Sequence, residues 1–526
     1  MAEDARGLGN ETIEADLCII GAGAAGITLA SKFANSNIRV LLLESGGPSI
    51  DRETERLNSE ATVTGLGYPL QASRLRFIGG TTNHWAGNCY RFLERDFEAK
   101  PGIAHTGWPI RLSDVEPFLP EASQIALFRE EPADWDPADW RKRLHTAAWD
   151  IDPGKFTSRV TFLANNPATD DKTFANYLPR FEKAPNVRFL TNANVVELIG
   201  GGSVESARVR TIAGNEMTVR AKTFILATGG VENARLLLAS RRSNPNGMGN
   251  QNDQVGRYFG DHVVISQYFV RNPDIPLDRL ILQQPFYRDT EAFSHFVIGD
   301  EAFREQGLDD VFLRFDPVPE KPREGELALW RLKDAVAGGS PGQIKGADVV
   351  AAITRPHESG GALLRRAVCR NGDPIAFKVA GRLTPRPHPD SRITLSDRTD
   401  KVGMPIANLN WALADEGKHS LHRAFELFAQ EAGRLNLGRF QLTFDPAQPW
   451  PDYPEMDVGF HHTCSTRMSD DPRNGVVDRN CRVHGMDNLY VAGSSVFSTA
   501  GSGSPTMMLV ALSLRLADHL RKERFA

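Results

Sequence analysis

Three glycines near the start of the chain, Gly21, Gly23 and Gly26, stand in GxGxxG spacing, and Glu44 follows near the offset where a dinucleotide-binding unit carries its acidic residue. Gly21 would permit a tight turn, Gly23 would let the backbone approach a pyrophosphate, and Gly26 would allow close packing of a helix on a strand. Phosphates would then lie at the positive end of the helix dipole, and Glu44 would accept hydrogen bonds from ribose hydroxyls. These residues predict nucleotide binding.

The elements that must position these residues are those of a βαβ unit. A short apolar run over 15–20 predicts a buried strand that ends at the glycines. Residues 25–36, rich in small and apolar side chains, predict a helix, and the apolar run 38–45 predicts a second strand that closes at Glu44. Because all four features occur together, the pattern favours a nucleotide site over an ordinary strand-to-helix turn.

The pattern after this unit favours FAD over a nicotinamide cofactor. Residues 46–90 predict loops instead of further helix–strand alternation, and a helix is expected over 113–128 with Ser113 as its N-cap. Strands resume at 186–199 and 216–226 as an inserted ribbon that returns to the nucleotide-binding sheet. A second glycine turn at 227–230 precedes a helix over 231–240. An interrupted sheet of this kind is typical of large flavoproteins.

The middle of the chain, about 262–455, is the candidate substrate-binding domain. Strands are expected at 391–397 and 405–411, and a helix at 419–436. Two runs, the proline- and charge-rich residues 315–326 and the glycine-rich residues 335–348, predict mobile surface loops.

Composition sets the class of protein. The 526 residues are 41% hydrophobic and 24% charged with a net charge of −5, which excludes a largely disordered chain and gives no sign of nucleic-acid binding. No apolar run approaches the roughly 18–20 residues that span a bilayer. The five cysteines form no CxxC pair, and the acidic N-terminus lacks the features of a secretory signal. We therefore expect reduced thiols and a cytoplasmic location, with export alongside a partner subunit left open.

The last seventy residues carry a second dense group of motifs. The block contains GFHHTCSTRM, GVVD and RVHG, followed by an apolar strand, NLYVAGSS, that ends in small residues. A long helix with apolar spacing is expected to begin near Pro505, because proline is favoured in a first helical turn. The free N–H groups of that helix would point at an electron-rich ring edge.

These motifs together resemble the glucose–methanol–choline (GMC) oxidoreductases. The resemblance rests on GAGAAG with Glu44, GGTTNHW, ATGGVEN, VGRYFGDH and the block from His461 to Leu520. Bacterial sugar or glycoside oxidoreductases and pyranose oxidase-like members are the most similar in motif. The resemblance implies an α/β fold with a Rossmann-like FAD-binding domain of the para-hydroxybenzoate-hydroxylase type, and an inserted substrate-binding domain built on an antiparallel sheet. It also implies FAD, bound covalently or not, and oxidation of an alcohol by hydride transfer to flavin N5.

The expected domains are discontinuous. Residues 1–110, 185–262 and 456–526 are expected to form the FAD-binding domain, and residues 111–184 and 263–455 the substrate-binding domain.

The resemblance also implies catalytic residues. The general base of the family is the histidine seven residues before the methionine of the carboxyl-terminal block, here His461, with His462 as the alternative. In an extended segment the two side chains would point to opposite faces, so only one would face the flavin. The second catalytic position is Asn or His in many relatives but Ser504 here. Serine can form a hydrogen bond but cannot act as a base, which leaves its role open.

His84 matches the spacing at which some relatives carry a histidine bonded covalently to the flavin. The alternative is that His84 only packs against the flavin, with FAD held noncovalently. Asn83 and Trp85 are expected to neighbour the flavin in either case. The full set of expected cofactor-binding residues is Gly21, Gly23, Ala24, Ala25, Gly26, Glu44, Ser45, Gly80, Thr81, Asn83, His84, Trp85, Ala86, Val195, Ala227, Gly229, Asn233, Gly493, Ser494, Ser504, Pro505 and Thr506.

Other chemistries fit the sequence less well. No G-x-S-x-G elbow and no HExxH spacing is present, so neither a serine nucleophile nor a metal site is expected. The favoured substrate is a hydroxyl of a sugar, glycoside or cyclitol. A steroid or aliphatic alcohol dehydrogenase, a flavoprotein without turnover, and a non-redox lyase are the alternatives. Oxygen, a quinone or a redox protein stays open as the electron acceptor.

Overall fold

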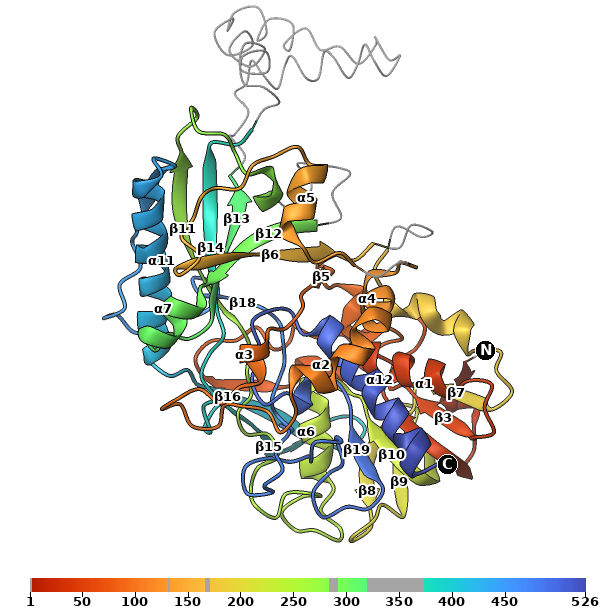
Figure 1. Ribbon diagram of the computed structural model, residues 1–526. Coiled ribbons are helices and arrows are strands. Elements are labelled where there is room, and N and C mark those ends of the chain that lie inside the picture. Colours follow the sequence, from red (N-terminus) through yellow and green to blue (C-terminus); the bar gives the residue numbers. More distant parts are fainter. Residues whose placement is uncertain (1, 131–132, 166–170, 283–291, 319–372) are drawn as a thin grey trace, which may run out of the picture.

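The computed structural model describes residues 2–130, 133–165, 171–282, 292–318 and 373–526. Two large sheets form two halves of the molecule, one below the other in Figure 1, and chain segments from both ends meet in the lower half. The described part of the chain contains no helix that is long and apolar enough to cross a membrane. The expected loop over 335–348 lies outside the described residues.

The lower sheet has a parallel core extended by an antiparallel ribbon. The four residues at the end of its central strand, Leu17–Ile20, are all buried, as expected for a strand covered on both faces. Its strand order within the described residues is β1 (Glu3–Asp4), β7 (Val187–Thr191), β3 (Val40–Leu43), β2 (Thr12–Ile20), β10 (Glu216–Leu226), β9 (Ser206–Arg210) and β8 (Asn194–Ile199), and β19 (Leu489–Val491) also pairs with β10. The predicted βαβ unit and the inserted ribbon are confirmed.

Three helices flank this sheet. The helix α1 (Ala24–Phe33) follows the glycine turn, and α6 (Gly229–Ala239) follows the second glycine turn. The last helix, α12 (Thr506–Glu523), begins near Pro505 as expected, with that proline at the N-cap instead of in the first turn. It packs against α1, so these two helices from opposite ends of the described chain are neighbours (Figure 1).

The upper sheet is antiparallel throughout. One of its faces packs against the amphipathic helix α11 (Glu416–Arg434). The packing is so close that a side chain at Gly381 would collide with the ring of Phe425 on that helix. Its order within the described residues is β17 (Gly438–Gln441), β11 (Val263–Arg271), β14 (Ala376–Leu383), β13 (Val311–Pro317), β12 (Ala292–Ile298), β6 (Phe156–Leu163) and β5 (Asn88–Cys89), and β18 (Asp457–Val458) pairs with β11.

The remaining elements are a small sheet, short α-helices and 3₁₀ turns. A small sheet joins β4 (Thr62–Gly65), β16 (Pro405–Trp411) and β15 (Arg392–Thr399). The short α-helices are α2 (Arg52–Ser59), α3 (Glu94–Phe97), α4 (Leu119–Leu127), α5 (Pro137–Arg143) and α7 (Asp300–Glu305). The 3₁₀ turns are η1 (Ala5–Gly7), η2 (Gly80–Asn83), η3 (Leu112–Asp114), η4 (Glu116–Phe118), η5 (Phe174–Arg180), η6 (Arg279–Ile281) and η9 (Ser494–Val496).

Three local predictions are wrong. The helix expected from Ser113 begins at Leu119, with Phe118 at its N-cap, because Pro117 lacks an N–H and residues 112–118 form two 3₁₀ turns. Residues 46–90 contain α2 and β4 rather than loops alone. The loop expected over 315–326 begins inside β13, where Phe315 is fully buried, and residues 319–326 of that run lie outside the described part of the chain.

Candidate active site

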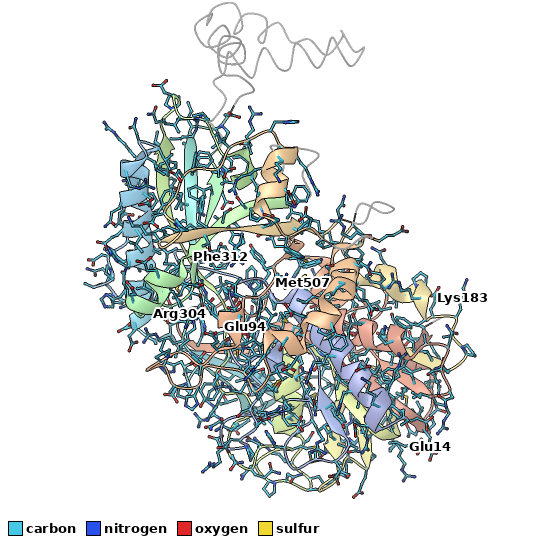
Figure 2. The ribbon with its side chains drawn as sticks, in the orientation of Figure 1. Glu14, Glu94, Lys183, Arg304, Phe312 and Met507 are labelled. Atoms are coloured by element: carbon cyan, nitrogen blue, oxygen red, sulfur yellow. The ribbon has the colours of Figure 1, made fainter. Side chains whose placement is uncertain are left out.

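A cavity of about 570 Å³ lies between the two halves of the molecule. The lower sheet contributes the glycine turns and the N-termini of α1 and α12, and the upper sheet contributes side chains of β13 and β14. Phe312 on β13 and Met507 on α12 both lie toward the middle of the molecule (Figure 2). The sequence-predicted residues that line the cavity are Gly21, Gly23, Ala24, Ala25, Glu44, Ser45, Gly80, Thr81, His84, Trp85, Ala86, Val195, Ala227, Gly229, His461, His462, Gly493, Ser494, Ser504, Pro505 and Thr506.

Three predicted residues lie behind the cavity wall and shape it. A side chain at Gly26 would meet the carbonyl oxygen of Gly21 at 1.8 Å, so this glycine lets α1 pack against the turn. The Asn83 amide donates to the carbonyl oxygens of Ile78 and Gly80, at 3.0 and 2.8 Å. Asn233 is fully buried and accepts a hydrogen bond from the backbone N–H of Thr228.

The geometry of the first turn fits a dinucleotide. Gly21 has φ +107°, in the region that favours glycine, and a side chain there would lie 2.5 Å from the carbonyl oxygen of Ala227. At Gly23 a side chain would meet nothing within 4 Å, so the backbone is open to the cavity. Gly23 also forms the N-cap of α1 with no side-chain hydrogen bond, which leaves the N–H groups of the first turn available to a pyrophosphate.

Glu44 ties the ends of two strands together at the cavity. One carboxylate oxygen accepts from the backbone N–H of Ala22 at 2.8 Å, and the other accepts from the N–H of Gly46 at 2.9 Å. The side chain is buried and borders the cavity beside Ser45. These contacts fix the carboxylate where β3 ends, which is where a ribose would lie in a dinucleotide fold.

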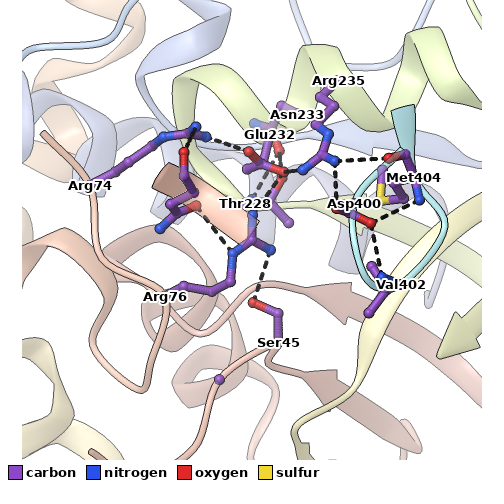
Figure 3. Close-up of polar contacts among 12 residues, drawn as sticks. Ser45, Arg74, Arg76, Thr228, Glu232, Asn233, Arg235, Asp400, Val402 and Met404 are labelled. Carbon is purple, nitrogen blue, oxygen red and sulfur yellow. Dashed lines mark hydrogen bonds and ion pairs between the residues drawn. The ribbon is translucent and has the colours of Figure 1, made fainter. Parts of the chain in front are cut away.

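A charged cluster borders the same end of the cavity (Figure 3). Glu232 accepts from Arg74 and forms ion pairs with Arg76 at 3.0 Å and Arg235 at 3.1 Å. Arg235 also pairs with Asp400 at 2.6 Å. The three guanidinium groups hold the pKa of Glu232 far below its ordinary value despite the burial of its carboxylate. Three positive charges thus face two negative ones at the cavity wall.

His461, which lines the cavity, pairs with a second histidine, His262, which does not line it. The Nδ1 atoms of His262 and His461 lie 2.9 Å apart, and Nε2 of His262 lies 2.8 Å from the carbonyl oxygen of Gly501. A carbonyl oxygen can only accept, so Nε2 of neutral His262 carries the proton and its Nδ1 accepts. His461 must therefore donate from Nδ1, which leaves Nε2 of His461 unprotonated. This chain of hydrogen bonds makes His461 a base at Nε2.

Burial keeps this base neutral. Burial first, and then the neighbouring His262 and Arg382, hold the pKa of His461 well below its ordinary value. Burial and the same arginine lower the pKa of His262 to about 3. Both imidazoles are therefore neutral near pH 7, and the direction of the hydrogen bonds described above applies there.

Asp261 holds the segment that carries His461. One carboxylate oxygen accepts from the backbone N–H of His461 at 2.9 Å and of His262 at 2.6 Å, and the other accepts from the Tyr68 hydroxyl at 2.6 Å. Burial raises the pKa of Asp261 to about 6. One polar atom from each of Asp261, His262 and His461 lies within 4.8 Å of the others, a spacing that a metal could use, but the hydrogen bonds above account for these atoms.

His462 faces different neighbours from His461. Its ring packs against Phe259 and Tyr68, with centroid separations of 5.4 and 5.8 Å, and its buried Nε2 has no hydrogen-bond partner in the described chain. Burial lowers its pKa to about 3. His461 therefore belongs to the hydrogen-bonded histidine pair, whereas His462 packs among aromatic side chains.

Two further predicted residues line the cavity from separate segments. His84 ends the 3₁₀ turn η2 with an exposed side chain, and partial desolvation lowers its pKa. Ser504 is buried just before α12, and its hydroxyl lies 3.5 Å from Nη1 of Arg382. The Ser504 side chain, shorter than the Asn or His of many relatives, therefore lies beside the positive charge of Arg382 from the upper sheet.

The residues missed by sequence reasoning are His262, Asp261, Arg382 and the arginines around Glu232. A signal for the first two existed, because they end the VGRYFGDH motif at 255–262. No sequence signal indicates Arg382, since a single arginine in a strand forms no recognisable spacing pattern.

Comparison with known proteins agrees with this geometry. A model described as FAD dependent oxidoreductase matches residues 16–301, more than half of the chain, and a model described as GMC oxidoreductase matches residues 387–513. The chain therefore belongs to the FAD-dependent oxidoreductases, and among them to the GMC oxidoreductases. The predicted family, the α/β fold and the FAD cofactor are confirmed.

Several characterised proteins resemble the whole chain. 6'''-Hydroxyparomomycin C oxidase of Streptomyces lividus is 25% identical, with 97% of this chain and 93% of that protein covered. The fructose dehydrogenase large subunit of Gluconobacter japonicus is 24% identical, with 97% and 98% covered. The crystal structure of pyridoxine 4-oxidase from Mesorbium loti, at 18% identity, has a TM-score of 0.58 and covers 97% of this chain and 100% of that one, so the fold is shared.

Proposed function

We propose that this enzyme oxidises a hydroxyl group of a sugar, glycoside or related alcohol to a carbonyl. The observation that carries the proposal is the unprotonated Nε2 of His461, a residue that lines the cavity. Its protonation state follows from the hydrogen bonds through His262 to Gly501. Two relatives that match almost the whole chain are named as an oxidase of a paromomycin derivative and a fructose dehydrogenase, which supports the substrate class.

The chemistry divides between the cofactor and the chain. Bound FAD supplies an acceptor for the C–H hydrogen of the substrate together with its two electrons. His461 takes the hydroxyl proton at Nε2, and donates at Nδ1 to His262 throughout. Asp261 keeps the His461 backbone in place. We assign Ser504 a hydrogen bond to the substrate, because its hydroxyl is buried beside the cavity and cannot act as a base.

Several residues would hold the cofactor. We propose that Gly21 to Ala25 take the pyrophosphate at the N-terminus of α1, that Glu44 takes a ribose, and that the N-terminus of α12 faces the flavin ring. The first turns of both helices, which line the cavity, and the open backbone at Gly23 support this assignment. We also propose the domain division expected from the sequence, with β5 and β18 as short strands that the FAD-binding segments add to the upper sheet.

His84 would attach FAD covalently or only pack against it. If the bond forms, acid-precipitated protein keeps its flavin, and His84→Ala releases it to the supernatant. Flavin found wholly in the supernatant of the wild type would show the noncovalent form. His105→Ala is a suitable control, because that histidine also lies partly exposed but does not line the cavity.

The direct test is anaerobic mixing of the FAD-loaded enzyme with sugars, glycosides, cyclitols, steroids and aliphatic alcohols. Bleaching of the visible flavin absorbance by a sugar or glycoside is the expected result, and bleaching by no hydroxyl compound would contradict the proposal. Oxygen, a quinone or a redox protein added afterwards identifies the acceptor. We propose a cytoplasmic location, supported by the free thiols of Cys18, Cys89, Cys464 and Cys481.

A further inference from the structure

Arg382 is a buried positive charge at the cavity without a carboxylate partner in the described chain. Its side chain is 8% exposed and borders the cavity, and no described carboxylate oxygen lies within 4.0 Å of its guanidinium. The polar contact that it makes is the 3.5 Å approach of Nη1 to the Ser504 hydroxyl, and its guanidinium carbon lies 4.7 Å from the centre of the Phe312 ring. An isolated buried charge of this kind is costly unless a partner of opposite sign meets it.

Of the other described arginines that are buried as deeply, Arg271 and Arg467 donate to backbone carbonyl oxygens and the rest pair with carboxylates. Arg74 and Arg235 contact Glu232, and Arg95 contacts Asp310 at 3.0 Å. Arg467 has no carboxylate, but it donates to the carbonyl oxygen of His105 and does not line the cavity. Arg382 is therefore distinguished by facing open space where a ligand can reach it.

The strand geometry aims Arg382 into the cavity. Successive side chains of β14 alternate between the faces of the upper sheet, and the neighbouring Gly381 packs against Phe425 of α11. Ala380 and Arg382 share the other face, and both line the cavity with Phe312 and Arg314 of the adjacent strand β13. Arg382 therefore projects from the face that α11 does not cover.

The two carboxylates whose charge acts on Arg382, those of Asp261 and Asp316, are engaged elsewhere. Asp316 pairs with Arg314 at 2.8 Å, and Asp261 accepts the three hydrogen bonds described above. The charge of Arg382 reaches His461, where it contributes to the lowered pKa of that base. An anionic group bound to Arg382 would lie in the same cavity as the hydroxyl from which His461 takes the proton.

We propose that Arg382 binds a carboxylate of the substrate, so that the preferred substrates are hydroxy acids such as aldonates and uronates rather than neutral sugars. This inference rests on the proposed function, because it names the substrate class of the same site. A guanidinium binds a carboxylate through two parallel hydrogen bonds, which gives orientation as well as affinity. Ser504, shorter than the Asn of many relatives, leaves room beside the guanidinium.

The first experiment measures binding without turnover. Calorimetric titration of the FAD-loaded enzyme compares tetrahydropyran-2-carboxylate with its neutral carboxamide, since neither probe has a hydroxyl to oxidise. We expect the carboxylate to bind about 10–100-fold more tightly, the usual range for a hydrogen bond to a charged group. Arg382→Gln should abolish the difference. Arg439→Gln, an exposed arginine of β17 in the same sheet, should preserve it. Equal binding of the two probes to the wild type would overturn the inference.

The second experiment compares oxidation of matched pairs, gluconate with sorbitol and glucuronate with glucose, in wild type and variants. A preference for the acids that disappears in Arg382→Gln supports the inference. Neutral sugars that reduce the flavin as fast as the acids, or an Arg382→Gln variant that slows both members of a pair equally, would overturn it while leaving the proposed function intact. If no compound reduces the flavin, the proposed function fails, but the titration still measures whether Arg382 binds the carboxylate probe. If Arg382→Gln does not fold, Arg382→Lys keeps the charge, and its acid preference should weaken without disappearing.

Discussion

The Nδ1 atoms of His262 and His461 lie 2.9 Å apart, although the two residues are 199 positions apart in the sequence. Because His262 donates at its other nitrogen to Gly501, it can only accept from His461. The contact therefore selects the tautomer of His461 that can act as a base at Nε2. A structural histidine that merely filled space would not impose this direction.

His262→Ala tests the relationship. We expect the rate of flavin reduction to fall about 10–100-fold, as when an orienting partner of a working histidine is removed. His262 is also one cause of the lowered pKa of His461, so the acid limb of the pH–rate profile should move to higher pH. An unchanged profile in a folded, FAD-loaded variant would reduce His262 to a packing role.

The two adjacent histidines should differ in effect. His461→Ala should lower flavin reduction by about 10²–10⁴-fold, the usual span for loss of a general base. FAD should stay bound, because the glycine turn that would hold it lies elsewhere in the cavity. His462→Ala should cost much less, since its ring packs against Phe259 and Tyr68. Should His462→Ala prove the more damaging change in stopped-flow measurements, the assignment of the base must move to His462.

Glu232→Gln should destabilise the protein. The change leaves Arg74, Arg76 and Arg235 with one fewer counter-charge in a buried setting, and removing one partner of a buried ion pair costs about 3–5 kcal/mol. Urea unfolding of the FAD-loaded protein measures the loss. Glu121→Gln is the matched control, because its pair with Lys32 is exposed and contributes about 0–1 kcal/mol. Equal midpoints for the two variants would show that the cluster does not stabilise the fold.

Stability should decrease as the pH falls below about 6.5. Burial lowers the pKa of His262, His295 and His462 to about 3 and that of His461 well below its ordinary value, so the unfolded chain takes up protons that the folded chain does not. Burial raises the pKa values of Asp261 and Asp96 to about 6 and also raises those of Asp278 and Asp309, and these four carboxyl groups act with the opposite sign. Burial also lowers the pKa values of His84, His105 and His519, so the histidines remain the larger group.

Thermal unfolding across pH measures this balance. His295→Gln removes one of the titrating groups, so its stability should fall less steeply between about pH 6 and pH 4, by about 1.4 kcal/mol per pH unit for the missing proton. A wild-type stability that rises on acidification in this range would contradict the neutral state of the buried histidines.

Local signals in the sequence were sufficient for the nucleotide-binding half. The turn at Gly21 needs a positive φ and close packing, and the types of the residues at and near this position indicate both. The helix predicted from Ser113 failed because a favourable cap residue was outweighed by Pro117, which interrupts helical hydrogen bonding. The sequence signals for α2 and β4 were too weak to be recognised within the charged, glycine-containing segment that surrounds them.

The active-site pairings could not be predicted because they depend on distant segments. His262 follows β10 and α6 and enters β11, whereas His461 precedes β19, and no spacing rule connects them. The direction of Arg382 depends on which face of β14 the helix α11 covers, and that is decided by Phe425, more than forty residues later. Sequence patterns thus identified single residues, and the folded sheets determined which of them meet.

The neighbourhood of α1 and α12 has a consequence for how the enzyme is made. A ribosome adds about 5–20 residues per second. The interval between synthesis of the glycine turn and synthesis of α12 is therefore on the order of a minute. During that interval Ala24 and its neighbours lack the helix against which α1 packs, and β2 lacks the partner strand β10 for much of the time. We therefore expect cofactor capture to follow the synthesis of α12, so a nascent chain halted before residue 506 should fail to retain flavin however well its first βαβ unit has formed.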